Sequence, residues 1–142
     1  MTTDNPFDEL WDSTGRVVVV NEGVHSDIVG DFTDMNGEVI LKASLASVKL
    51  TLFDRNTRAV INSRNLQNVL DANGGTVDAD GVITMRLIDI DNVILDVEGE
   101  LEAGDIEEHI ARFTWGWNDG VLDRESEKNW LVRVRKKDVP VA

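Results

Sequence analysis

Cysteine is absent from this sequence of 142 residues, and so are several features that mark particular classes of protein. Without cysteine the chain can form neither a disulfide framework nor a thiolate metal site, which fits a reducing compartment. No apolar run approaches the length of a membrane span, so we do not expect a membrane among the partners of this protein. Residues Met1 to Pro6 lack a basic region followed by an apolar stretch, and the sequence therefore predicts no secretion signal.

Residues and motifs for catalysis are scarce as well. There are two histidines, His25 and His109, and no Gly-x-Ser-x-Gly elbow that would present a nucleophile. The stretch Asn73-Gly74-Gly75 is not followed by the lysine of a phosphate-binding loop. A glycosidase-like pair of carboxylates is an open alternative, but the sequence singles out no such pair. We expect a protein that is not an enzyme and needs no cofactor.

Basic residues are few, and they are unevenly placed. The chain has 27 acidic and 14 basic residues, a formal net charge of −13, so it would repel the phosphates of nucleic acid. From Arg124 onward six basic residues stand against three acidic ones, a local +3 that leaves −16 for residues 1–123. This basic end is either a solvated surface or a region that docks on an acidic neighbouring copy. Its candidate partner-binding residues are Arg133, Arg135, Lys136 and Lys137.

What the sequence does contain is a strong β pattern near its C-terminal end. Residues 108–117 alternate with period two, as a strand with one face on a core does. A partner strand follows at residues 129–135, after the turn-prone link 118–128. The side chains expected to face the core are His109, Ala111, Phe113, Trp115, Trp117, Trp130, Val132 and Val134.

Shorter strands precede these two, with one change of period. We expect strands in 38–42, 47–54, 59–61, 76–79, 82–88 and 93–95, with a hairpin turn at Asp80-Gly81 and an acidic surface loop over 96–107. In 63–70, Leu66, Val69 and Leu70 have helical spacing behind a capping Ser63. The prediction is therefore mainly β: an immunoglobulin-like antiparallel β-sandwich with one short helix over residues 39–137, followed by a tail at 138–142.

Residues 1–38 differ from the rest, because nine acidic residues accompany a single basic one and apolar residues are sparse. Such a segment is not expected to fold alone, and we interpret it as an extended N-terminal arm. The valine run in it is suited to joining a sheet edge of its own chain or of another subunit. The alternative is a first strand of the same domain behind a loose leader. The candidate partner-binding residues of the arm are Phe7, Leu10, Trp11, Val17, Val18, Val19 and Val20.

Two further sites are weaker alternatives. The turns that contain Asp78 and Asp80, and Asp89, Asp91 and Asn92, offer oxygen ligands of the kind that calcium prefers. Turn chemistry alone explains these residues, so we predict no metal. Trp115, Trp117 and Trp130 would suit a sugar-stacking platform, although core packing is the simpler interpretation.

Four stretches together carry a resemblance: Leu50-Thr-Leu-Phe-Asp, then Ile61-Asn-Ser-Arg-Asn-Leu-Gln-Asn-Val-Leu-Asp-Ala-Asn-Gly-Gly-Thr-Val-Asp-Ala-Asp-Gly-Val-Ile-Thr, then Asp91-Asn92, and Glu108-His-Ile-Ala-Arg-Phe-Thr-Trp-Gly-Trp-Asn. In overall pattern, residues 46 to 137 resemble the immunoglobulin-like virion proteins of tailed bacteriophages and prophages. The arm is not part of the resemblance.

The resemblance implies a non-enzymatic structural protein, present in many copies in the particle and made in the cytoplasm of the bacterial host. Expected partners are other virion proteins, namely portal, connector, capsid or tail subunits, and further copies of the chain. We favour the head-to-tail junction, or neck, where the arm would grip a neighbour and acidic walls would repel passing DNA. The alternatives are a capsid decoration protein on the head surface and a carbohydrate-binding module of a tail or fibre.

Overall fold

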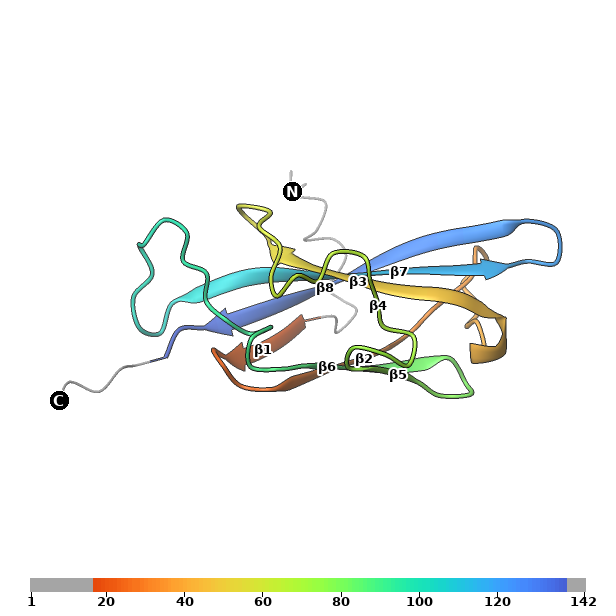
Figure 1. Ribbon diagram of the computed structural model, residues 1–142, viewed down its shortest axis with the longest axis horizontal. Coiled ribbons are helices and arrows are strands. Elements are labelled where there is room, and N and C mark those ends of the chain that lie inside the picture. Colours follow the sequence, from red (N-terminus) through yellow and green to blue (C-terminus); the bar gives the residue numbers. More distant parts are fainter. Residues whose placement is uncertain (1–16, 138–142) are drawn as a thin grey trace, which may run out of the picture.

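The computed structural model describes residues 17–137, which form two β-sheets packed face to face. Figure 1 shows β3, β7 and β8 in one layer and β2, β5 and β6 in the other. This arrangement confirms the predicted mainly β sandwich. In chain order the elements are β1 (Val17–Asn21), β2 (Ser26–Asp31), the 3-10 helix η1 (Lys42–Ser44), β3 (Leu45–Asp54), β4 (Gln67–Asn68), β5 (Gly75–Val77), β6 (Val82–Leu87), β7 (Ile106–Asn118) and β8 (Asp123–Arg135).

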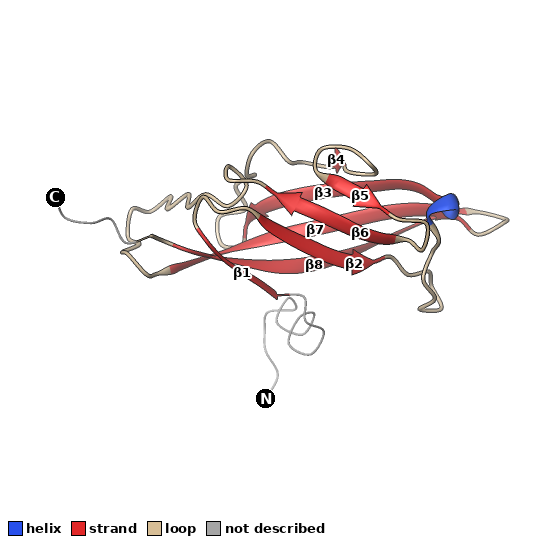
Figure 2. Cartoon of the chain, turned by 90° about the horizontal axis from the view of Figure 1, so that it is seen from below, coloured by secondary structure: helices blue, strands red, loops and turns tan. Residues whose placement is uncertain are grey.

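The larger sheet has the strand order β1-β8-β7-β3-β4, and the smaller one has the order β2-β6-β5. All pairs of the described strands are antiparallel except β1 with β8, which is parallel. The predicted antiparallel arrangement therefore holds for every strand but the first. β7 and β8 form a long hairpin that runs the length of the molecule, as Figure 2 shows.

The core lies between the sheets, on the faces that the alternating patterns predicted. Trp115, Phe113 and Trp130 are buried, and the rings of Phe113 and Trp130 meet edge to face with centroids 5.1 Å apart. Phe32 packs on Trp115 with ring centroids 5.0 Å apart. Aromatic packing of this kind, together with the buried leucines of β3, makes the long hairpin the centre of the fold.

The predicted arm is wrong for residues 17–38, because the structure places them inside the sandwich. Residues Val17–Asn21 pair in register with Leu131–Arg135 of β8, and Ile28 and Phe32 are fully buried in the core. The few apolar residues of this segment are thus enough to anchor it, while Asp27 and Asp31 lie at the surface. Residues 1–16, including Phe7, Leu10 and Trp11, and the predicted tail at 138–142 lie outside the described residues.

The helix predicted over 63–70 is also wrong. Ser63 and Leu66 have positive φ angles of 55° and 51°, which a right-handed helix does not allow, and Gln67–Asn68 form β4 beside β3. Residues 38–42 give an isolated bridge from Val39 to Thr33 in place of a strand, and 93–95 form no strand. Within residues 17–137 the only helix is η1. No helix in that range has the length and apolar character needed to cross a membrane.

Candidate functional site

Buried polar residues gather where β3 ends and β7 begins. Asp54 and His109 are directly opposite each other in the β3–β7 pair, and both are buried. The Nε2 atom of His109 lies 2.6 Å from Oε1 of Glu107, two residues earlier on the same face of β7. His109 was expected on the core-facing side of its strand, and the structure buries its imidazole completely, beside a carboxylate.

Glu107 holds the loop between β6 and β7 in place. Its carboxylate accepts hydrogen bonds from the backbone N–H groups of Leu95 and Asp96, at 2.9 and 2.8 Å. Burial raises the pKa of Glu107, but the bonds from His109, Leu95 and Asp96 outweigh burial, and the net pKa lies below the usual value. Since both of its oxygens already accept bonds from the protein, Glu107 serves to fix the loop.

A cleft of about 230 Å³ adjoins this cluster. Asp54 lines it, and one carboxylate oxygen of Asp54 accepts bonds from the hydroxyl and the backbone N–H of Thr57. Three more acidic residues of the lining, Asp96, Glu98 and Glu100, come from the β6–β7 loop. In residues 17–137 no group of three histidine, cysteine or acidic side chains is arranged to hold a metal ion. Half of the ten residues that line the cleft are acidic.

The acidic residues of the turns considered as calcium sites accept hydrogen bonds from their own chain. Asp91 is fully buried and accepts two bonds from Arg64, at 2.6 and 2.9 Å, and one from the amide of Asn62 at 2.8 Å. One oxygen of Asp78 accepts bonds from the backbone N–H groups of Asp80 and Val82, at 2.9 and 3.0 Å. These carboxylates stabilise turns, as turn chemistry predicted.

The tryptophans of the long hairpin do not form a sugar-binding platform. Trp115, Trp117 and Trp130 are each 5% exposed or less, and the Nε1–H of Trp115 donates to the carbonyl oxygen of Thr33 at 3.1 Å. The interpretation of these rings as core is confirmed. A carbohydrate site built on them is excluded, because a stacking sugar needs an exposed ring face.

The predicted partner-binding valines are used within the chain. Val17 to Val20 form β1, where they pair with Leu131 to Val134 of β8. Val20 is buried against the core, while Val17 and Val19 are exposed on the outer face of the five-stranded sheet. The expectation that the run joins a sheet edge is confirmed, and the edge belongs to its own subunit.

The basic C-terminal residues make contacts in different parts of the molecule. Lys136 Nζ donates to the carbonyl oxygen of Leu101 at 2.8 Å and lies 3.4 Å from a carboxylate oxygen of Asp96, so it binds the acidic loop of its own chain. The backbone N–H of Lys137 donates to the carboxylate of Glu22 at 2.8 Å. Arg133 lies 3.6 Å from Glu108 on the outer face of the sheet, and Arg135 is exposed. They do not form one basic docking patch.

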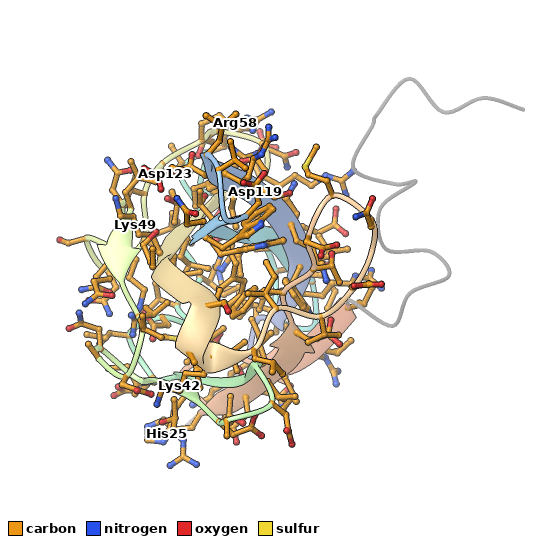
Figure 3. All side chains as sticks on the ribbon, turned by 90° about the vertical axis from the view of Figure 1, so that its right-hand side faces the viewer. His25, Lys42, Lys49, Arg58, Asp119 and Asp123 are labelled. Atoms are coloured by element: carbon orange, nitrogen blue, oxygen red, sulfur yellow. The ribbon has the colours of Figure 1, made fainter. Side chains whose placement is uncertain are left out.

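The end of the β7–β8 hairpin is a feature that sequence reasoning missed. At its tip Val121 and Leu122 are 84% and 54% exposed. Asp119 links the residues of the tip: one of its carboxylate oxygens accepts bonds from the N–H groups of both apolar residues, and the other accepts a bond from Arg124. The bond from Leu122 first, then those from Arg124 and Val121, lower the pKa of Asp119 to about 2. Figure 3 views this end, with Asp119 and Asp123 labelled beside the hairpin.

Further exposed apolar residues lie at the same end. Met35, Val39 and Leu41 belong to the loop that joins β2 to η1, and this loop lies at the hairpin end of the sandwich in Figures 1 and 2. Five of the thirteen large apolar side chains that are exposed within residues 17–137 thus belong to this loop and the hairpin tip. We call Val121, Leu122, Met35, Val39 and Leu41 the hairpin-end surface. Its sequence signal was an apolar pair, Val121-Leu122, inside an otherwise polar turn.

Comparison with models of protein families, with curated proteins and with solved structures finds no match to this chain. The fold and the candidate site define a two-sheet β-sandwich whose longest hairpin carries an exposed apolar pair at its tip.

Proposed function

We propose that this chain is a non-enzymatic structural protein of a tailed-bacteriophage virion, located at the head-to-tail junction. It docks to neighbouring portal, connector, capsid or tail subunits and to further copies of itself. The observation that carries the proposal is the hairpin-end surface, where a rigid tip presents two adjacent apolar side chains to solvent. A preorganised apolar tip binds with little loss of conformational entropy, which suits a subunit that assembles in many copies.

The strand order supports an immunoglobulin-like sandwich, which is the fold that the sequence resemblance implies. If β2 to β8 are lettered B, C, C′, D, E, F and G in chain order, the two sheets become B-E-D and G-F-C-C′. This order matches the variable form of the immunoglobulin pattern without strand C″, except that β1 lies beside G, where that pattern has its first strand beside B. The absence of cysteine separates this chain from antibody domains but leaves the topology unchanged.

The mode of docking differs from what the sequence suggested. Residues 17–38 were expected to grip a neighbour as an arm, but they form β1 and β2 of the sandwich and are committed to their own fold. The hairpin-end surface takes over that role in the proposal. Because β7 and β8 also supply seven of the 21 buried residues of the main core, a contact at their tip connects directly to the interior of the protein.

The net charge of the chain favours a location at the head-to-tail junction over one on the head surface. A net charge of −13 makes the walls of a ring repel DNA, and DNA passes through the junction during packaging and ejection. Capsid decoration stays the alternative placement, because an exposed sandwich bound by one end suits it equally well.

Replacement of the two apolar residues at the hairpin tip by acidic ones tests the proposal. We expect the double variant Val121→Asp/Leu122→Asp to fold normally and to be lost from purified particles, as measured by quantitative mass spectrometry of the virion. The control is Val97→Asp, at a valine of the β6–β7 loop that is 63% exposed. Normal incorporation of the tip variant would rule out docking by the hairpin end. Absence of the unmodified chain from particles would rule out the virion role itself.

A further inference from the structure

The cleft of about 230 Å³ beside Asp54 lies at the end of the sandwich opposite the hairpin tip. Its lining comes mainly from the turn after β3 and from the loop between β6 and β7, which Figure 1 shows at the far end from the β7–β8 turn. The volume is below the roughly 300 Å³ at which pockets for drug-sized ligands begin. The cleft therefore has room for a small ligand or for the end of a longer chain.

One carboxylate oxygen distinguishes this cleft from an ordinary acidic surface. Asp54 lines the cleft and is only 4% exposed, and strand alternation puts its side chain on the same side of the sheet as that of Leu52 in the core. The Oδ2 atom of Asp54 accepts two bonds from Thr57, but Oδ1 is buried and accepts none from the described residues. A buried acceptor without a donor is unfavourable, so this oxygen requires a donor that residues 17–137 do not supply.

The residue opposite Asp54 does not provide this donor. His109 faces Asp54 across the β3–β7 pair and is fully buried. Its Nε2 atom lies 2.6 Å from Oε1 of Glu107, and an ionised carboxylate can only accept, so the ring proton sits on Nε2. The neutral imidazole then has no proton on Nδ1, and this atom also has no partner among the described residues. Acceptors on two facing residues thus lack a donor.

The charge of the cleft determines which kind of donor fits. Among the described residues that line it, five are acidic and none is basic. Lys136 lies 3.4 Å from a carboxylate oxygen of Asp96 and offsets part of this charge. The ion pairs formed within residues 17–137 include neither Asp54, Glu98 nor Glu100. The cleft therefore keeps a negative field, which attracts a cationic donor.

Apolar residues complete the lining of the cleft, namely Val97, Leu101 and Ile106. An alkyl chain can pack on them while its charged end reaches the carboxylates, as the stem and ammonium group of a lysine do. We propose that the cleft binds a primary alkylammonium group, which donates a hydrogen bond to Oδ1 of Asp54. An ammonium group has three donors and no acceptor, so it matches a site built from acceptors. A metal ion fits less well, because no three side chains of residues 17–137 are arranged to hold one. The inference is independent of the virion role.

Titration of the full chain with small amines, followed by the backbone amide signals in NMR spectra, tests the proposal. Pentylamine should give saturable shifts at Thr57, Val97 and Leu101. Tetramethylammonium has the same charge but no N–H donor, and it should bind much more weakly. Equal binding of the two cations would overturn the assigned hydrogen bond. Failure of pentylamine to shift any signal of the cleft would overturn the proposal and leave water as the donor to Asp54.

The source of the ammonium group is distinguished by a second probe. N-acetyl-lysine methylamide carries the same charge as pentylamine and represents a lysine side chain of another protein. Binding of this compound at the cleft would support a protein partner that inserts a lysine. Binding of pentylamine alone would support a free amine as the ligand, because the cleft would then exclude the peptide backbone.

Substitution of Asp54 separates the site from the general negative charge of the chain. In Asp54→Asn the remaining oxygen can still accept the bonds from Thr57, but an N–H donor replaces the free acceptor. The affinity for pentylamine should fall about tenfold or more. The control Glu125→Gln removes the same charge from an exposed position of β8 outside the cleft, and it should change the affinity by no more than about twofold. Equal affinities of the two variants would overturn the site.

A second variant keeps the test independent of folding. Glu98 and Glu100 are exposed in the β6–β7 loop, so Glu98→Gln with Glu100→Gln should leave the amide spectrum of the sandwich unchanged. Because both carboxylates line the cleft, this variant should bind pentylamine several-fold more weakly than the Glu125→Gln control. The same affinity in both would overturn the role of the cleft.

Discussion

Arg64 and Asp91 form a two-pronged ion pair inside the protein, with Nε–Oδ1 at 2.6 Å and Nη2–Oδ2 at 2.9 Å. Asp91 is fully buried and Arg64 is 4% exposed. The backbone N–H of Ile88 and the side-chain amide of Asn62 also donate to the Asp91 carboxylate, both at 2.8 Å. The pair thereby joins the 62–64 turn to the corner after β6.

Loss of one member of this pair should be costly. Arg64→Met leaves the Asp91 carboxylate buried without its cation, and we expect the free energy of unfolding to fall by about 3–5 kcal/mol. Urea unfolding followed by circular dichroism measures the change. The control Arg86→Met breaks a surface pair with Asp27 and should cost about 0–1 kcal/mol. Equal effects of the two substitutions would contradict the structural role of the buried pair.

Trp115→Ala should destabilise the sandwich by about 3–5 kcal/mol, because the ring is fully buried and its removal leaves a cavity between the sheets. The variant also leaves the carbonyl oxygen of Thr33 without its donor. Thermal unfolding measures the effect. Val121→Ala, at the exposed tip, should change the stability by no more than about 0.5 kcal/mol. An unchanged melting temperature for Trp115→Ala would place this ring outside the core.

Gly30→Ala tests the close approach of the two sheets. A Cβ atom at this position of β2 would lie 2.4 Å from Cζ2 of Trp130, which is itself buried and has no room to move. We expect a loss of about 1–3 kcal/mol from overpacking. Val29→Ala, at the exposed position one residue earlier, is the control for a substitution in the same strand. Calorimetric melting curves of both variants would compare them, and a fully stable Gly30→Ala protein would disprove the contact.

The hairpin tip should open in acid. The pKa of Asp119 is lowered from 3.8 to about 2, so its ionised form stabilises the folded tip. This contribution is fully present above the unfolded value of 3.8 and is lost as the pH falls through about 2. The protection of the Val121 and Leu122 amides, measured by NMR between pH 5 and pH 2 relative to the intrinsic exchange rate at each pH, should fall as Asp119 becomes protonated. With Asp119→Asn the protection of these amides should no longer depend on Asp119 ionisation, and an unaltered pH profile in that variant would contradict the assignment.

The sequence predicted the parts of the fold that depend on strong alternation. Phe113 and Trp115 on β7 and Trp130 on β8 repeat with period two, and the structure buries all three. The prediction of an arm was wrong for residues 17–38 because it relied on the composition of the whole segment, which conceals the effect of single apolar residues. Ile28 and Phe32 are few among acidic residues, yet each is fully buried, and two such side chains suffice to anchor a strand.

Other features could not be read from local pattern. The helical spacing of Leu66 and Val69 was misleading, because pairing of residues 67–68 with β3 overrides a weak helix preference. The partner of Asp91 is Arg64, and nothing in the sequence indicates which of 14 basic residues enters the interior. The apolar pair at the hairpin tip was visible in the sequence, but the three bonds to Asp119 depend on the turn geometry, which local pattern does not reveal.

The parallel pairing of β1 with β8 has a consequence for the order of folding. Val17 is made well before its partner Leu131, which follows it by 114 residues in the chain. The five-stranded sheet cannot be completed before β8 has been made, and closure of so long a loop is entropically slow. We therefore expect β1 to dock last in refolding, after the β7–β8 hairpin. Until then the edge of β8 is open, and newly made subunits pass through a stage at which they are vulnerable to aggregation.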